Sequence, residues 1–135
     1  MKETDILIVD DDPHISKSIF RALKNFDYEM VSAQNGEEAL KLISQNQFKV
    51  IISDVKMSKM DGLELLDKVY QIDSNISRVV LSGHADVKLI LKLVNQKGID
   101  KYLLKPWEND DLVLAIKKCI EWYDLRRGAC SATQA

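Results

Sequence analysis

Three aspartates follow short apolar segments of this sequence, at positions from which their side chains could act together. Asp10 and Asp11 come directly after residues 6–9, and Asp54 comes after residues 50–53. Carboxylates that share a small cleft repel one another, so each resists ionisation unless a cation lies among them. Because oxygen ligands with room for water suit Mg²⁺, the three aspartates predict a magnesium site.

A hydroxyl and an ammonium group follow two further apolar segments. Ser82 comes after residues 79–81, and Lys105 comes after residues 102–104. In a cleft that holds a cation, these two side chains could hydrogen-bond and neutralise a phosphoryl group. Together with the carboxylates they indicate phosphoryl transfer, with one aspartate as the acceptor.

These side chains can meet only if the segments before them are strands of one sheet. The three most apolar runs do not alternate with polar residues, which is typical of strands covered on both faces, as in a parallel sheet. The second run in the chain is weaker than the others. The five expected strands are residues 6–9, 28–31, 50–52, 79–81 and 102–104.

Helical patterns with capping signals separate the expected strands. Asp12 and Pro13 can open the first helix, because an N-cap followed by proline suits the first helical turn. Asn35 and Asp61 each stand three residues before a glutamate, which is a capping pattern for two more helices. The two remaining helices are expected at residues 86–98 and 108–127.

The alternation of strands and helices predicts an α/β fold, a doubly wound five-stranded parallel sheet with five helices on both faces. The segments between consecutive expected strands are too long for hairpin turns, so they imply right-handed crossover connections. In such a sheet, ligands bind beyond the carboxyl ends of the strands, where the strand order reverses. The residues that could do chemistry are therefore expected in one site at this edge.

Composition places the chain among globular domains. Its 135 residues carry a net charge of −2 and are 46% hydrophobic and 30% charged, which suits one domain, expected over residues 1–127. Residues 128–135 are expected to be a disordered tail or a linker stub. The near-neutral charge gives no case for nucleic acid or an anionic membrane, and no signal peptide or membrane span is found. Two cysteines without paired spacing predict neither a disulfide framework nor zinc, so a cytoplasmic location is expected.

Four segments, taken in order, resemble the receiver domain of bacterial two-component response regulators. They are residues 8–11, IVDD; residues 53–62, SDVKMSKMDG; residues 81–83, LSG; and residues 102–106, YLLKP. The resemblance covers about residues 5–125 and is specific because all four segments stand at expected strand ends. It implies the flavodoxin-like strand order 2-1-3-4-5.

The resemblance implies that Asp54 is the phosphoacceptor. It would take a phosphoryl group from the phosphohistidine of a sensor histidine kinase or from a phosphotransfer protein. Asp11 and Asp54 would bind Mg²⁺ directly, Asp10 would bind it through water, and the backbone carbonyl of Lys56 would complete the protein ligands. Mn²⁺ could substitute for Mg²⁺.

The same resemblance assigns roles to the remaining site residues. Lys105 would pair with the phosphoryl group, and the hydroxyl of Ser82 would bond one of its oxygens. Tyr102 stands where the family has a switch aromatic that turns inward with this hydroxyl. The switched face, formed by helix 4, strand 5 and helix 5, would control an output domain or partner and could form a homodimer. The bond between Lys105 and Pro106 is expected to be cis.

Side chains at two neighbouring positions are expected to set the lifetime of the phosphate. In the family that the sequence resembles, side chains at these positions control the access of water to the phosphate. Lys56, two residues after Asp54, and His84, two residues after Ser82, could shield an aspartyl phosphate, so the resemblance implies slow self-dephosphorylation. Ser58 departs from the family pattern, which usually has proline there.

Residues 94–107 resemble one branch of the family. Members of that branch often precede a cyclic-di-GMP phosphodiesterase domain of the HD-GYP type or an AAA+ transcription activator.

Two other functions compete with a signalling phosphoacceptor, which would be no enzyme beyond its own phosphorylation and dephosphorylation. One is a phosphatase of the haloacid dehalogenase type, with Asp10 as the nucleophile and Asp12 as the acid. That hypothesis needs threonine or valine after Asp12, where Pro13 stands, and a cap domain that the sequence lacks. The other is a scaffold that binds partner proteins without being phosphorylated. The presence of Asp10, Asp11 and Asp54 together with Lys105 argues against a scaffold.

Overall fold

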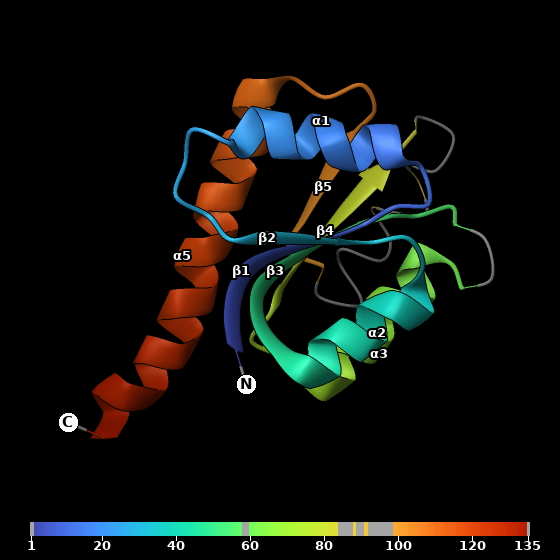
Figure 1. The fold of residues 1–135 in the computed structure, drawn as a ribbon. Coiled ribbons are helices and arrows are strands. Elements are labelled where there is room, and N and C mark those ends of the chain that lie inside the picture. The colour runs from blue at the N-terminus through green and yellow to red at the C-terminus, as the bar shows by residue number, and fades with distance from the viewer. Residues whose placement is uncertain (1, 58–59, 84–87, 89–90, 92–98, 135) are drawn as a thin grey trace.

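A five-stranded parallel sheet forms the centre of the computed structural model, which describes residues 2–57, 60–83, 88, 91 and 99–134 (Figure 1). The strands are β1 (Lys2–Val9), β2 (Met30–Ala33), β3 (Asn46–Asp54), β4 (Ser77–Ser82) and β5 (Lys101–Leu104). Their order is β2-β1-β3-β4-β5, which confirms the expected order. Since neighbouring strands are all parallel, their carboxyl ends meet at one edge.

Helices cover both faces of this sheet. The described helices are α1 (Pro13–Leu23), α2 (Gly36–Gln45), α3 (Gly62–Ile72) and α5 (Asn109–Gln134). α1 and α5 pack on one face, and α2 and α3 pack on the other (Figure 1). The helix expected at residues 86–98 falls on a segment of which only residues 88 and 91 are described.

Alternate residues of the central strands supply two separate cores. In β1, Ile6 and Ile8 pack in the cluster under α1 and α5, whereas Leu7 and Val9 pack in the cluster under α2 and α3. All four side chains are completely buried. Because both faces of the strand are covered, it is apolar without alternation, which is why its pattern predicts a parallel sheet.

The expected caps open the first three helices. Backbone N–H groups in the first turns donate to three cap side chains: His14 to Asp12 at 2.9 Å, Glu38 to Asn35 at 2.9 Å and Glu64 to Asp61 at 2.8 Å. Each bond satisfies an N–H group that the start of a helix leaves unpaired. The caps therefore determine where the loops after β1, β2 and β3 end.

The second strand begins later than its sequence predicts. β2 consists of Met30–Ala33, whereas residues 28–31 were expected. The ring of Tyr28 stacks on the ring of Phe26, with centroids 5.9 Å apart, and its backbone N–H donates to the carbonyl of Phe26. These contacts hold Tyr28 in the turn before the strand. Tyr28 therefore lies outside β2, although tyrosine is a residue that favours strands.

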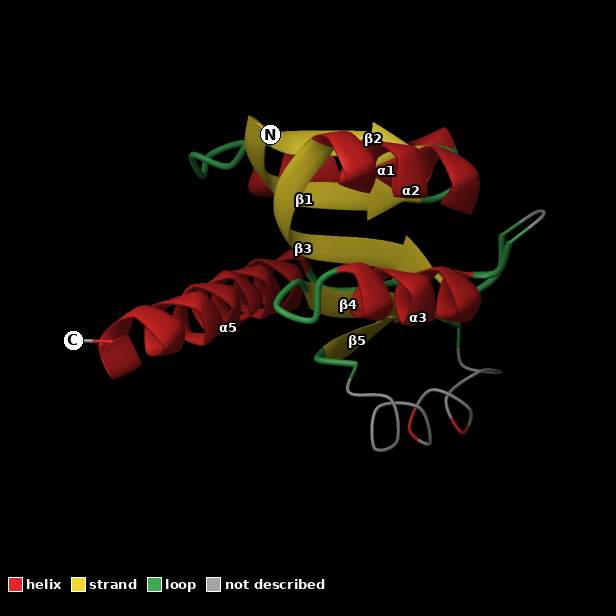
Figure 2. Ribbon diagram, turned by 90° about the horizontal axis from the view of Figure 1, so that it is seen from below, coloured by secondary structure: helices red, strands yellow, loops and turns green. Residues whose placement is uncertain are grey.

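The last helix ends later than the sequence predicts. α5 continues to Gln134, beyond the expected end at about Arg127. No proline follows Gly128, and the alanines at 129 and 132 favour helix, so the signal to stop is weak. Figure 2 shows the final turns of α5 extending away from the sheet.

Within the described residues, no helix combines the length and the hydropathy that a membrane crossing requires.

Candidate functional site

The aspartates that follow β1 and end β3 meet at the carboxyl edge of the sheet. The register pairs Val9 of β1 with Ser53 of β3, so Asp10 and Asp54 come next on neighbouring strands. Oxygen atoms of Asp10, Asp11 and Asp54 all lie within 4.8 Å of one another. The fold therefore brings the three predicted carboxylates into one group, called here the acidic cluster.

Lys105 reaches the acidic cluster from the loop after β5. Its Nζ lies 2.7 Å from Oδ2 of Asp54 and 3.9 Å from Oδ2 of Asp10. Its backbone N–H donates to the carbonyl of Ser82 over 2.8 Å, which holds the loop against the end of β4. The expected cis bond between Lys105 and Pro106 is present. The ammonium group thus partly neutralises two of the three carboxylates.

Asp10 is the most deeply buried member of the acidic cluster. Its side chain is 1% exposed, compared with 14% for Asp54. Its pKa is raised from 3.8 to about 6, mainly by burial. The charges of Asp54 and Asp11 also raise this pKa, whereas the hydrogen bond from the N–H of Asp12 and the charge of Lys105 lower it. Its surroundings therefore do not fully compensate the negative charge of Asp10.

A divalent cation fits the donor set of the acidic cluster. Oδ1 of Asp10 accepts a hydrogen bond from the N–H of Asp12 at 2.8 Å, but its buried Oδ2 has no hydrogen-bond donor among the described residues. Leaving a buried oxygen without a donor costs about 1–3 kcal/mol, and more when it is charged. Lys105 Nζ, 3.9 Å from this oxygen, is too far to donate a hydrogen bond to it. Because Mg²⁺ binds hard oxygen ligands and keeps several waters, its positive charge and its bound waters would suit this oxygen.

Ser82 ends β4, and its hydroxyl is engaged by the backbone next to it. Its side chain is buried, and its Oγ donates to the carbonyl of Gly83 over 2.8 Å. A hydroxyl has one proton to donate, so it must leave this carbonyl before it can donate to a phosphoryl oxygen. The structure therefore joins the backbone of Ser82 to Lys105 at the site, while the hydroxyl of Ser82 bonds the neighbouring carbonyl of Gly83.

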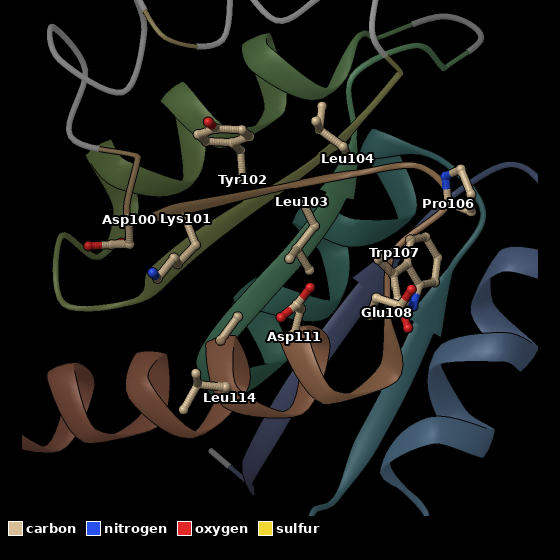
Figure 3. A pocket seen from close by; sticks show the side chains of 11 residues that line it. Asp100, Lys101, Tyr102, Leu103, Leu104, Pro106, Trp107, Glu108, Asp111 and Leu114 are labelled. Atoms are coloured by element: carbon tan, nitrogen blue, oxygen red, sulfur yellow. The ribbon is translucent and has the colours of Figure 1, made fainter.

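Tyr102 lies on the face of β5 opposite to Leu103 (Figure 3). Its half-buried side chain packs against the core under α2 and α3 and lines a pocket of about 610 Å³ between β5 and the start of α5. The register pairs Tyr102 with Val80, and Leu104 with Ser82. The two residues of the expected switch therefore lie on neighbouring strands, two register positions apart.

The residues expected to set the phosphate lifetime are described only in part. Lys56 is exposed in the loop after β3. His84 lies outside the described residues, and so does Ser58, where the sequence departs from the family pattern. Lys56 is thus a solvent-exposed side chain two residues after Asp54.

Sequence reasoning missed two contacts with the backbone of Asp54. The hydroxyl of Ser53 donates to the carbonyl of Asp54 over 3.0 Å. Gly62, the first residue of α3, approaches the same carbonyl closely. In the sequence, Gly62 closes the family-like segment 53–62 and follows the Asp61 cap. Both signals place a helix start, and neither indicates a contact with the backbone of Asp54.

Comparison with known proteins finds the same kind of domain. The family model described as response regulator receiver domain matches residues 6–117. Over 120 residues, the chain is 29% identical to the transcriptional regulatory protein GlrR of Escherichia coli and 31% identical to the hydrogenase transcriptional regulatory protein HoxA of Cupriavidus necator. These matches cover 89% of this chain but only 27% and 25% of the two relatives. The chain thus spans about a quarter of the length of these curated relatives.

Solved structures share the fold over nearly the whole chain. One described as adenylate cyclase from Rhodopirellula baltica has a TM-score of 0.91 at 32% identity and covers 98% of both chains. A response regulator receiver domain protein from Clostridium thermocellum has a TM-score of 0.83 at 30% identity, over 90% of this chain and 98% of that one. The signal receiver domain of an HD domain-containing protein from Pseudomonas fluorescens has a TM-score of 0.86 at 30% identity, over 95% and 94% of the two chains.

Proposed function

This chain belongs to the response regulator receiver domain family of two-component systems, and on that premise we propose that Asp54 is its phosphoacceptor. The donor would be the phosphohistidine of a sensor histidine kinase or of a phosphotransfer protein. The observation that carries the proposal is the 2.7 Å contact of Asp54 Oδ2 with Lys105 Nζ inside the acidic cluster. Asp54 is also more accessible than Asp10, with 14% against 1% exposure.

In the proposed reaction, an oxygen of the Asp54 carboxylate attacks the phosphorus of the donor. The oxygen–phosphorus bond forms as the bond between phosphorus and the imidazole nitrogen breaks, and the electron pair of that bond leaves with the imidazole. Lys105, already beside Asp54, transfers its hydrogen bond to an oxygen of the incoming group and stabilises its charge. Asp54 thereby changes from a carboxylate paired with lysine into an acyl phosphate.

Metal binding is assigned to Asp10, Asp11 and Asp54, with the backbone carbonyl of Lys56 as a further ligand. Bound Mg²⁺ supplies positive charge that neutralises the carboxylates and the phosphoryl oxygens. Asp11 and Asp54 would bind directly and Asp10 through water, which is consistent with the deeper burial of Asp10. Mn²⁺ would substitute because carboxylate, carbonyl and water ligands suit it as well.

Phosphorylation would act on the rest of the domain through Ser82 and Tyr102. The Ser82 hydroxyl would leave the carbonyl of Gly83 and donate to a phosphoryl oxygen, and the Tyr102 ring would turn inward. β5 and α5, together with the segment 84–98, would then offer a changed surface to an output domain, a partner or a second copy of the chain. The support for this route is that Tyr102 is only half-buried and lines a pocket of about 610 Å³ on this face.

The receiver unit is assigned to residues 1–127, and residues 128–135 to a tail or linker. We propose an output domain of the AAA+ or HD-GYP type, acting in the cytoplasm. Two comparisons support this choice: GlrR and HoxA are transcriptional regulatory proteins longer than this chain, and one structural relative comes from an HD domain-containing protein. We propose no direct contact of this domain with nucleic acid or a membrane.

The phosphatase hypothesis has less support from the geometry. Asp12 would be its acid, but the Asp12 carboxylate is exposed and caps α1 by accepting from the N–H of His14 at 2.9 Å. Its nucleophile would be Asp10, the least accessible member of the acidic cluster. We therefore favour a signalling domain whose only chemistry is its own phosphorylation and dephosphorylation.

Intact-mass spectrometry after incubation with acetyl phosphate and Mg²⁺ tests the proposal directly. We expect one added phosphoryl group on the wild type, no addition on Asp54→Asn, and no addition on the wild type in EDTA. Labelling that persists in Asp54→Asn but disappears in Asp10→Asn would support the phosphatase-like hypothesis. A wild type that accepts phosphate neither from acetyl phosphate nor from histidine kinases would support the scaffold.

A further inference from the structure

The first residue of α3 lies directly against the backbone of Asp54. A Cβ atom added to Gly62 would lie 1.8 Å from the carbonyl oxygen of Asp54, 2.8 Å from its carbonyl carbon and 2.9 Å from Oγ of Ser53. The backbone N–H of Gly62 donates to the carbonyl of Val55 over 2.8 Å. The start of α3 is therefore docked on the end of β3, so closely that no side-chain atom fits between them.

The obstacle at Gly62 is main chain, which distinguishes this glycine from Gly36. Both are the first helical residue after a capping Asp or Asn. A Cβ at Gly36 would meet the side chain of Met60, with Sδ nearest at 2.7 Å, and a methionine side chain can change its rotamer. The carbonyl of Asp54 belongs to the last residue of β3 and can move only if the backbone of that residue moves.

A second contact holds the same carbonyl from within β3. Ser53 is completely buried, and its Oγ donates to the carbonyl of Asp54 over 3.0 Å. The neighbouring N–H of Val55 donates to the carbonyl of Leu81 in β4 over 3.2 Å. The peptide unit between Asp54 and Val55 is thus restrained by a hydroxyl, by β4 and by the start of α3.

We propose that Gly62 and Ser53 are positioning residues for the phosphorylation of Asp54. They hold its backbone so that its carboxylate lies within the acidic cluster and 2.7 Å from Lys105. The inference rests on the proposed function of Asp54, and it concerns residues that touch neither the phosphoryl donor nor the metal. A displacement of about 1 Å in a reacting group can reduce a rate by about a hundredfold, so this restraint matters for the reaction.

Alanine at Gly62 must separate α3 from β3 or displace Asp54. In either case the Asp54 carboxylate shifts relative to Asp10 and Asp11, and both metal binding and phosphorylation are expected to weaken by at least about tenfold. Ser53→Ala removes one restraint and adds no atom, so a decrease of about threefold is expected for it, in line with the loss of one hydrogen bond. Gly36→Ala is expected to stay within about twofold of the wild type, because methionine repacks easily.

The test uses the full chain and three readouts. Mn²⁺ affinity is measured by electron paramagnetic resonance of the free ion, the phosphorylation rate by intact mass with acetyl phosphate and Mg²⁺, and folding by circular dichroism with thermal unfolding. The variants are Gly62→Ala, Ser53→Ala, the double variant Ser53→Ala/Gly62→Ala, and Gly36→Ala as the matched control. A merely structural role would lower the unfolding temperature and leave the Mn²⁺ affinity of the folded protein unchanged.

We expect Gly62→Ala to fold, to bind Mn²⁺ more weakly and to be labelled more slowly than the wild type. The double variant should not regain the wild-type Mn²⁺ affinity or labelling rate, because the carbonyl of Asp54 still obstructs the added Cβ atom. Wild-type Mn²⁺ affinity and labelling rate in folded Gly62→Ala would overturn the proposal, and so would full recovery in the double variant. If Gly62→Ala does not fold, Ser53→Ala decides, and unchanged affinity and rate in it count against the proposal. If the wild type binds Mn²⁺ but is never labelled, the acceptor role of Asp54 fails, while the Mn²⁺ measurements still test the positioning.

Discussion

Nζ of Lys105 lies 2.7 Å from Oδ2 of Asp54, although Asp54 ends β3 and Lys105 follows β5, two strands that are not neighbours in the sheet. β4 lies between β3 and β5, and the lysine side chain spans its end. A longer contact of 3.9 Å joins the same ammonium group to Asp10. The ammonium group of Lys105 thus lies against two carboxylates of the acidic cluster, where we expect it to compete with a metal ion and to pair with an incoming phosphoryl group.

Replacement of Lys105 should change metal binding and phosphorylation in opposite directions. In Lys105→Gln the competing positive charge is gone, so Mg²⁺ affinity is expected to rise by about threefold to tenfold at low salt. The phosphorylation rate is expected to fall by at least about tenfold, because the stabilising charge on the incoming group is lost. Titration calorimetry and intact-mass kinetics measure the two quantities.

Lys68→Gln is the matched control, since this exposed lysine pairs with Glu64 at 3.7 Å on the surface of α3. It should leave both quantities unchanged. If Lys105→Gln weakens metal binding, the ammonium group supports the metal site and does not compete with it.

The raised pKa of Asp10 predicts metal binding that weakens in mildly acidic solution. In the folded protein this pKa is about 6, above the ordinary value of 3.8, so Asp10 becomes protonated as the pH falls below 6. A protonated carboxyl is a poor ligand, so Mn²⁺ affinity should fall by up to about tenfold per pH unit below that point. Between the two pKa values the folded protein binds more protons than the unfolded chain, so the metal-free protein should lose stability as the pH rises through this range.

Mn²⁺ titrations and urea unfolding in EDTA, repeated across this pH range, check both parts of the prediction. Asp10→Asn should remove most of the pH dependence of each. Asp12→Asn alters an exposed helix cap outside the acidic cluster, so it should retain the pH dependence of both Mn²⁺ affinity and stability. A wild-type affinity that stays constant down to pH values near 4 would contradict the assigned pKa of Asp10.

Arg126 should stabilise the domain by joining α5 to the sheet. Its guanidinium pairs with the carboxylate of Asp100 and donates to the carbonyl of Asn75 at 3.1 Å and to Oγ of Ser77 at 3.4 Å. Arg126→Ala would leave Asp100, whose side chain is 11% exposed, without this partner. The free energy of unfolding is expected to decrease by about 1–3 kcal/mol, measured by urea denaturation.

The neighbouring Arg127 provides the control for this prediction. It donates to the hydroxyl of Tyr123 within α5 at 2.7 Å and bridges no other segment by a described side-chain bond. Arg127→Ala should therefore lower the free energy of unfolding by less than Arg126→Ala. Equal losses would mean that the contact with Asp100 has no special part in holding α5.

The aspartyl phosphate is expected to persist, because Lys56 and His84 can shield it from water. Lys56 is exposed in the unphosphorylated protein, so its long side chain is free to fold over the new group. The decay of the added mass in Mg²⁺ buffer, after acetyl phosphate is removed, measures the lifetime. Lys56→Ala and His84→Ala should each shorten it, and a wild-type lifetime of seconds or less would overturn the expectation.

The fold and the main site residues follow from the sequence because they depend on local order along the chain. Buried parallel strands are apolar on both faces, so each one appears as an uninterrupted run, and the polar residue after it marks the carboxyl edge. The caps Asp12, Asn35 and Asp61 act on groups two or three residues away, which a sequence shows directly. The acidic cluster could therefore be predicted as a set.

Tertiary structure decides which atoms of these residues meet. Strand order and spacing bring Lys105 and Asp54 to the same edge, but the 2.7 Å contact depends on the path of the loop after β5. The Ser82 hydroxyl bonds the carbonyl of Gly83 and not the acidic cluster, a choice between nearby acceptors that composition does not encode.

The contacts of Gly62 with Asp54 and of Arg126 with Asp100 lie still further from what a sequence can indicate. They join residues on different elements, and their lengths depend on how closely helix and strand pack. The sequence by itself determined the residue types, the strands that carry them and the edge where they gather. Packing between distant segments determined the direction of each side chain and the position of the backbone beneath it, because close packing leaves few alternatives once the helices are docked.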